Sequence, residues 1–151
     1  MASIVFDADI GTGLVSHQSS DLNSLANAGY AFGTGGAAVV DNTTLRKLFL
    51  IVQLKLGSIT PSGPAHMRLF NIRSFDGGAT YEDPQSAAEP PIGVPVVQRG
   101  VFAGASAKIV IFPPLPILPG KSKLLVGNSV GVSLASSGNS LEYWFSTYAN
   151  T

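Results

Sequence analysis

The sequence predicts an all-β protein: an antiparallel two-sheet sandwich of the jelly-roll type, with about eight strands and an extended N-terminal arm. Apolar and polar residues alternate with a period of two along most of the chain, and no segment keeps a helical apolar stripe for more than two turns. Turns that contain Gly or Pro separate the alternating segments at about the 8–12-residue intervals of β-sandwiches. An immunoglobulin-like sandwich is the nearest alternative, because the absence of Cys excludes only the disulfide-linked members of that class.

The first part of the chain, residues 1–36, is expected to form an N-terminal arm and the first short strands, while residues 37–151 form the sandwich within a single domain. Glycines are frequent in the first part, and they weaken strands. Residues 1–20 are too polar to fill a core and too short to fold alone. We therefore expect them to order against a neighbouring subunit, with Ile4 and Phe6 as contact residues.

The clearest strand covers residues 45–56, where Leu50, Val52 and Leu54 share the face expected to enter the core. A second strand is predicted at residues 65–75, and the Gly- and Pro-rich connection between the two predicts a hairpin. Later strands are predicted at residues 94–102, 108–112, 122–126, 130–134 and 140–148.

The sequence also predicts the form of two connections between strands. Asn128 and Ser129 are expected to form a hairpin turn between the strands at residues 122–126 and 130–134. Residues 83–95 contain four prolines and are expected to form a surface excursion. The whole chain therefore reaches its last strand without a helical crossover.

A tight turn is predicted at Asp76, Gly77 and Gly78, because Asp-Gly pairs favour the positive φ angles that such turns need. Together with Glu82 and Asp83, this segment gathers three carboxylates, which makes calcium an alternative. The spacing does not match the twelve-residue calcium loop. We therefore expect neither a metal nor a cofactor.

Two short matches to functional motifs lack the context that their chemistry needs. Residues 127–131 fit the Gly-x-Ser-x-Gly pattern of a nucleophile elbow, but no helix is predicted after Ser129, and no Asp or His lies beyond it. Residues 120–122 resemble the end of a phosphate-binding loop, but the first Gly of that loop is absent. His17 and His66 have no neighbouring carboxylate in sequence, so we expect exposed or hydrogen-bonded histidines. An enzyme is not expected.

The composition indicates a surface that lies against other protein. Only 12% of the 151 residues are charged and the net charge is +0, whereas an ordinary soluble domain has about 25% charged residues. So few charges leave little repulsion between neighbours, and we expect a homodimer or homotrimer. The basic residues are scattered and the apolar stretches are too short to span a bilayer, so we expect neither nucleic acid nor membrane as a partner.

Aromatic residues stand on both faces of the last predicted strand. Tyr143 and Phe145 alternate with Trp144 and Tyr148, so one aromatic set points away from the core whichever face is buried. Trp and Tyr are enriched at protein interfaces, and they also stack against sugars. With so little charge in the chain, we favour a protein interface at Trp144 and Tyr148 over a sugar platform that includes Tyr81.

Three segments of the chain resemble small virion proteins of tailed bacteriophages. They contain a strand that ends in an Asp-Gly turn, a Pro-Gly-Lys-x-Lys strand and a hairpin that closes on Ser-Gly-Asn. The matching segments are Leu69–Asp83, Leu118–Asn128 and Gly131–Asn139, and the likeness extends over residues 40–148. Similar proteins include jelly-roll cement or decoration proteins, which sit on the assembled head and bridge neighbouring major capsid subunits.

This resemblance implies a non-enzymatic structural protein of a phage particle, made in the host cytoplasm and placed on the capsid surface. It implies the major capsid protein as a partner, beside further copies of the chain. A tail- or fibre-associated sandwich protein is the first alternative. A carbohydrate-binding module that uses Trp144, Tyr148 and Tyr81 is the second, and a hydrolase is the third.

Overall fold

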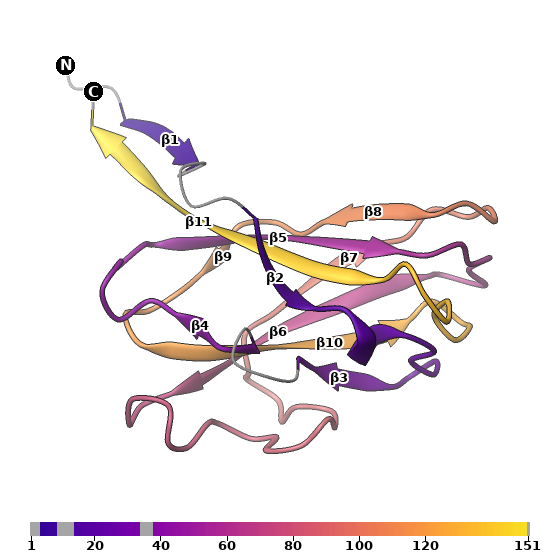
Figure 1. Ribbon diagram of the computed structural model, residues 1–151, viewed down its shortest axis with the longest axis horizontal. Helices are drawn as coiled ribbons and strands as arrows, with labels where there is room; N and C mark the ends of the chain where they lie inside the picture. The colour runs from indigo at the N-terminus through magenta and orange to yellow at the C-terminus, as the bar shows by residue number, and fades with distance from the viewer. Residues whose placement is uncertain (1–3, 9–13, 34–37, 151) are drawn as a thin grey trace.

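Two antiparallel sheets pack face to face in the computed structural model (Figure 1). The structure describes residues 4–8, 14–33 and 38–150, and of residues 4–8 and 147–150 it describes the backbone only. Sheet A contains β1 (Ile4–Ala8), β2 (Val15–Gln18), β5 (Phe49–Leu56), β8 (Lys108–Ile111), β9 (Leu115–Pro116) and β11 (Ser140–Asn150). Sheet B contains β3 (Tyr30–Phe32), β4 (Val40–Asp41), β6 (His66–Ser74), β7 (Val96–Gly100) and β10 (Lys121–Ser129). A short 3-10 helix, η2 (Ser20–Leu22), follows β2.

The order of the strands is that of a jelly roll. The main strands lie in the order β2-β11-β5-β8 in sheet A and β3-β10-β6-β7 in sheet B, while the two-residue strands β9 and β4 pair with β5 and β10. Numbered along the chain, these eight main strands form the orders 1-8-3-6 and 2-7-4-5, which is the double Greek key. The predicted all-β, jelly-roll sandwich is confirmed.

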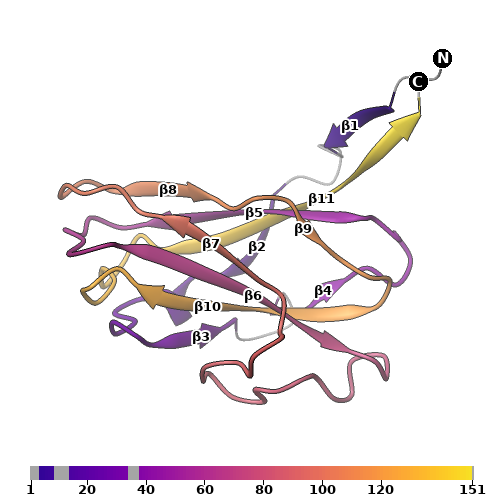
Figure 2. The ribbon, with the colours of Figure 1, turned by 180° about the vertical axis from the view of Figure 1, so that it is seen from behind.

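The N-terminal segment contributes strands to both sheets. β2 pairs with β11 in sheet A and β3 pairs with β10 in sheet B, so the sandwich includes parts of residues 1–36. The expectation that residues 1–20 are too polar for the core is wrong at His17 and Gln18, which are buried. β1 pairs with the end of β11, and the two strands form a ribbon that projects from the sandwich (Figure 2).

The predicted hairpin between residues 45–56 and 65–75 is wrong. β5 lies in sheet A between β11 and β8, whereas β6 lies in sheet B between β10 and β7. The connection of residues 57–65 therefore crosses from one sheet to the other. Both sides of β5 are occupied by other strands, so β6 packs across the core from β5 and does not pair with it.

The two strands predicted at residues 122–126 and 130–134 are one strand followed by a loop. β10 continues through Asn128 and Ser129 and pairs with β6 along its whole length. The turn is not at Asn128 and Ser129, because the chain bends only after β10, where Asn128 Oδ1 accepts from the N–H of Val130 at 3.1 Å. The Asn128 amide nitrogen meanwhile binds loop carbonyls. This Nδ2 atom lies 2.9, 3.1 and 2.9 Å from the carbonyl oxygens of Leu25, Ala26 and Val132.

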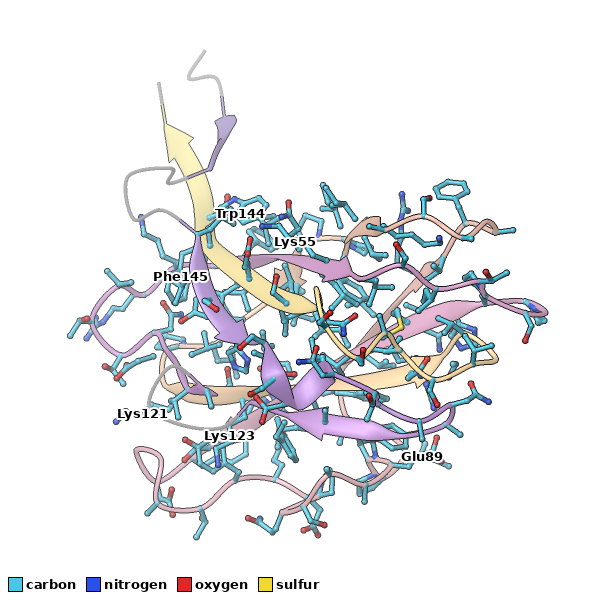
Figure 3. The ribbon with its side chains drawn as sticks, turned by 45° about the vertical axis from the view of Figure 1, so that its right-hand side comes forward. Lys55, Glu89, Lys121, Lys123, Trp144 and Phe145 are labelled. Carbon is cyan, nitrogen blue, oxygen red and sulfur yellow. The ribbon has the colours of Figure 1, made fainter. Side chains whose placement is uncertain are left out.

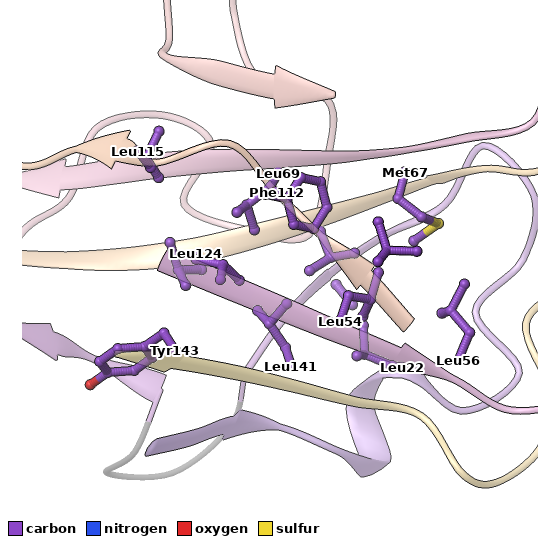
Figure 4. Packing of buried hydrophobic residues seen from close by; sticks show 14 of the residues in the cluster. Leu22, Leu54, Leu56, Met67, Leu69, Phe112, Leu115, Leu124, Leu141 and Tyr143 are labelled. Carbon is purple, nitrogen blue, oxygen red and sulfur yellow. The ribbon is translucent and has the colours of Figure 1, made fainter. Parts of the chain in front are cut away.

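The core fills the space between the sheets and follows from the alternation along the strands (Figure 4). Leu50, Val52 and Leu54 of β5 are fully buried, which confirms the face predicted for the core. Sheet B meets them with Met67 and Leu69 of β6. Burying a Leu or Met side chain contributes about 1.5–3 kcal/mol, so this layer is a major source of stability.

A β-bulge explains how two consecutive residues of β2 are both buried. The register between β2 and β11 shifts at Leu141 and Glu142, which lie opposite Gln18 and Ser16. His17 is therefore the extra residue of β2, and a bulge of this kind turns a side chain away from strict alternation. His17 and Gln18 consequently both face the interior.

The buried His17 ring is held neutral. It is 3% exposed and stands edge-on to Tyr143, with 5.9 Å between the ring centroids. Neither ring nitrogen has a hydrogen-bond partner among the described residues. Burial lowers the pKa of His17 from 6.5 to about 4, and the nearby Ala38 backbone and Asp21 oppose this shift only in part.

Replacing Leu50 by Ala should lower the free energy of unfolding by about 2–5 kcal/mol, because the shortened side chain leaves a cavity between the sheets. Urea denaturation followed by the fluorescence of Trp144, the single tryptophan, measures this loss. Leu48→Ala is the matched control, since Leu48 is 49% exposed and lies just before β5. A loss below about 1 kcal/mol for Leu50→Ala would contradict the assignment of this face to the core.

Acidification should destabilise the fold through His17. The unfolded chain binds a proton near pH 6.5 and the folded chain near pH 4, so the unfolded state holds more protons between these values. The contribution of His17 to stability is therefore fully present above pH 6.5 and is lost as the pH falls, by about 3 kcal/mol at pH 4 relative to neutral pH. Denaturation at a series of pH values across this range gives the free energy of unfolding at each pH. Its decrease with falling pH should be smaller in His17→Gln than in the wild type, with His66→Gln as the control. An unchanged pH dependence of the unfolding free energy in His17→Gln would assign the acid sensitivity to other groups.

Candidate interaction surface

The outer face of sheet B is covered by the chain itself. It carries a second apolar cluster of Phe70, Ile72 and Leu125, all of them buried. The segment of residues 75–95, which connects β6 to β7, lies over this face and adds Tyr81 to the cluster (Figure 2). β6 and β10, the central strands of sheet B, therefore carry buried apolar residues on both faces.

Arginine–glutamate pairs fasten this segment to sheet B. Arg73 donates from Nε and Nη2 to the two carboxylate oxygens of Glu82, at 3.2 and 2.9 Å. A second pair joins Arg68 to Glu89 at 2.9 Å, and the Arg68 guanidinium also lies 5.2 Å from the centroid of the Tyr30 ring. The hydrogen bonds from Arg73 lower the pKa of Glu82. A forked pair fixes orientation as well as distance, so it suits a fastening role.

The turn at Asp76, Gly77 and Gly78 is closed by its own hydrogen bonds. The two glycines have φ angles of +74° and +100°. The Asp76 carboxylate accepts from the N–H and Oγ1 of Thr80, at 2.8 and 2.6 Å, and from Oγ of Ser74 at 2.8 Å. These donors hold the pKa of Asp76 well below its usual range. Among the described residues, no group of three or more His, Asp or Glu side chains could hold a metal ion.

The outer face of sheet A presents large apolar side chains to solvent. Trp144 of β11 is half-buried and pairs across the sheet with Ile51 of β5 (Figure 3). Ile109 and Ile111 of β8 are 65% and 51% exposed, and both lie on this face because Val110 between them is buried. Ile51 itself is buried, so we call the surface formed by Ile109, Ile111 and Trp144 the sheet A face.

An ion pair lies on the sheet A face beside these apolar residues. Lys55 Nζ is 2.8 Å from Oε1 of Glu142. Gln53 and Ser140 donate to the same carboxylate at 3.4 and 3.3 Å. Because the two charges neutralise each other, the sheet A face carries a neutral polar cluster next to its apolar residues.

A groove borders the sheet A face where β7 and β8, the neighbouring edge strands of the two sheets, run close together. It has a volume of about 180 Å³, and its lining includes Arg99, Phe102, Ile109 and Ile111. Phe102 is 87% exposed. Within the described residues, neither edge strand has a strand neighbour on its outer side. Such edges, together with exposed apolar side chains, are typical of protein contact surfaces.

The predicted interface residues divide into two groups. Trp144 lies on the sheet A face, close to the point where β11 leaves the sandwich (Figure 3). Ile4 and Phe6 lie on β1, and the backbone of Phe6 pairs with that of Tyr148. The side chains of Ile4, Phe6 and Tyr148 fall outside the described residues. The structure therefore places one of the four predicted side chains, and it places it on an exposed face.

Two residues of the predicted sugar platform, Trp144 and Tyr81, are not brought together, and the side chain of the third, Tyr148, lies outside the described residues. Tyr81 lies against sheet B, where Lys123 Nζ is 4.3 Å from the centroid of its ring. Trp144 lies on the outer face of sheet A. Two aromatic rings on opposite outer faces of a sandwich cannot stack on one sugar, so Trp144 and Tyr81 do not share a site.

Sequence reasoning missed Ile109 and Ile111 as surface residues. The strand at residues 108–112 was predicted, but no contact was assigned to it. Its signal is the run of Ile109, Val110 and Ile111, which is apolar on both faces of a short strand. A strand with one face in the core and the other polar would alternate instead.

Comparisons with known proteins leave the residues themselves as the basis for function. No family model, no curated protein and no solved structure matches the chain. In the part of the chain that the structure describes, no helix is long and apolar enough to cross a membrane.

Gly78→Ala should lower the free energy of unfolding by about 1 kcal/mol or more, and by more than Gly77→Ala. Both positions need a positive φ, but a Cβ at Gly78 would lie 2.8 Å from Cδ of Lys121, whereas a Cβ at Gly77 meets nothing within 4 Å. Gly63→Ala is a matched control, since Gly63 has φ +68° and open space around it. Chemical denaturation of the three variants measures the difference, and equal losses in all three would contradict the packing at Gly78.

Calcium should leave the melting temperature of the protein unchanged, because the Asp76 carboxylate is already saturated by donors of its own turn. Differential scanning fluorimetry with and without calcium tests this. A calcium-dependent rise in melting temperature that disappears in Asp76→Asn would replace the structural turn with a metal site.

Proposed function

We propose that this chain is a non-enzymatic structural protein of a bacteriophage particle, a cement or decoration protein that binds the outside of the head and bridges major capsid subunits. The likeness of residues 40–148 to small virion proteins supports the phage particle as its location. The observation that carries the binding role is the sheet A face, which carries the exposed Ile109 and Ile111 and the half-buried Trp144. On the opposite face of the sandwich, residues 75–95 cover the apolar cluster of sheet B.

The size of the sheet A face limits how it can bind. A standard contact buries about 800 Å² per partner. A sheet four strands wide and eight residues long covers roughly 500 Å², from strand spacings of about 4.8 Å and a rise of about 3.3 Å per residue. The contact therefore extends past the flat face, and the groove between β7 and β8 is the adjoining apolar surface. Repetition of such a contact around a symmetric shell strengthens the lattice by multivalency.

A tail- or fibre-associated position would use the same surface, because the same apolar side chains could meet a tail protein. An electron-microscopy map of the intact particle distinguishes the two positions directly. The carbohydrate-binding alternative has less support, since Trp144 and Tyr81 lie on opposite faces of the sandwich.

Ile111→Lys should weaken binding to empty heads of the same phage by at least about fivefold, because burying an unpaired charge in the contact costs more than about 1 kcal/mol. Co-pelleting of the purified protein with heads measures occupancy. The stability of the variant should change by less than about 0.5 kcal/mol, since the side chain at position 111 is largely exposed.

Ile92→Lys is the matched control for this experiment. Ile92 is also an exposed isoleucine, but it lies in the segment that covers sheet B, so its replacement should leave occupancy unchanged. Equal occupancy of wild type, Ile111→Lys and Trp144→Ala would remove the sheet A face from the contact. Failure of the wild-type protein to bind either heads or tails would remove the particle role itself.

A further inference from the structure

β11 is longer than the sandwich to which it belongs. Ser140–Ser146 pair with β5, and Ser146–Asn150 pair with β1. The second half of β11 and β1 thus form a two-stranded antiparallel ribbon that extends beyond the two sheets (Figure 1).

One side of this ribbon lacks a strand. β5 begins at Phe49, opposite Ser146. Beyond that point, the side of β11 that had faced β5 has no strand next to it in the described residues. An isolated two-stranded ribbon is only marginally stable in water, and the backbone N–H and C=O groups along its open side are a template for another strand.

The open side of β11 suits a second copy of the same strand. Residues 147–150 of β11 contain no charged side chain, whereas β1 carries Asp7. Like charges opposite each other destabilise a strand pair, so self-pairing along β1 excludes the register in which the two Asp7 residues face each other, whereas no charge restricts the register along residues 147–150. The chain as a whole has a net charge of +0, so two copies do not repel each other at long range.

Exposed apolar side chains surround the base of the ribbon. Leu48 immediately precedes β5 and is 49% exposed. Trp144, half-buried, lies two residues before the last residue of β11 that pairs with β5 (Figure 3). A strand that pairs with residues 147–150 occupies the position next to β11 that β5 leaves open. The second subunit, which supplies this strand, then lies close to Leu48 and Trp144.

We propose that two copies of this chain pair through their β11 strands, edge to edge and antiparallel, around a two-fold axis. The product is a four-stranded sheet in the order β1-β11-β11-β1 that joins the two sandwiches. Identical edges meet, so the contact closes at two copies. This pairing does not depend on the particle role proposed above, because its hydrogen bonds are made by the ribbon. Of the sheet A face, it brings only Trp144, at the base of the ribbon, near the partner.

The two-fold symmetry makes a specific demand on the register. An axis normal to the sheet keeps each side chain on its own face, so one residue of β11 lies directly opposite itself in the partner. The chain contains no Cys, so in a single-Cys variant a disulfide can form only between the introduced residues of two copies. Thr147→Cys, Tyr148→Cys and Ala149→Cys, each made alone in the full chain, scan the centre of the open edge.

Mild oxidation of these variants at micromolar concentration should give a disulfide-linked dimer at one position, at least about tenfold above the control, because paired strands raise the effective thiol concentration to the millimolar range. Ser86→Cys is the control, since it is exposed on the segment that covers sheet B. Sedimentation equilibrium of the unmodified protein should give twice the chain mass of 15.6 kDa. Tyr148→Lys, which brings like charges near the axis, should weaken the dimer by at least about tenfold.

Three results would overturn this pairing. A monomer in sedimentation equilibrium would show that the edge stays open, and a trimer would exclude the two-fold contact. Cross-linking at positions 147–149 no stronger than for Ser86→Cys would place the contact elsewhere. Because these measurements use the isolated protein, a failure here leaves the head-binding experiment untouched, and a failure of head binding leaves the dimer intact.

Discussion

The fold depends on covering sheet B from both sides. β6 and β10 pair over nine positions and carry apolar residues on both faces. Their inner faces pack against sheet A, but Phe70, Ile72 and Leu125 on the outside would form an exposed apolar patch without residues 75–95. The arginine–glutamate pairs that hold this segment are therefore part of the core's architecture. Because residues 75–95 cover the apolar cluster on the outside of sheet B, the broad face left open to other molecules is that of sheet A.

Part of the charge that the chain carries is paired within the chain itself. Among the described residues, these pairs include Lys55–Glu142, Arg68–Glu89, Arg73–Glu82 and Lys121–Asp41. Such partly exposed pairs contribute little stability each, so their role is to orient loops and strands. With only 12% of its residues charged and a net charge of +0, the chain has little charge that would keep its copies apart.

The sequence predicted the fold class and the core face of β5 because both depend on local alternation, as at Leu50, Val52 and Leu54. It failed where a choice depended on residues distant in the chain. A hairpin and a crossover to the other sheet look alike between β5 and β6, and only the occupied sides of β5 decide between them. Asn128 favours turns locally, but loop carbonyls from residues 25–26 hold it within a strand. The open sheet A face could not be predicted, because it depends on which face residues 75–95 cover.

β11 connects the three environments of the molecule. Leu141, Tyr143 and Phe145 belong to the core, Trp144 belongs to the sheet A face, and residues 147–150 belong to the ribbon. Because β11 is continuous through all three, the twist within the sheet sets the direction in which the ribbon leaves the sandwich. A ribbon-linked pair would therefore present its two sheet A faces at a fixed relative angle. Two faces held in this way can bind two copies of a partner at once only where those copies repeat at the matching spacing, so the geometry of the dimer would restrict the arrangement of its partners.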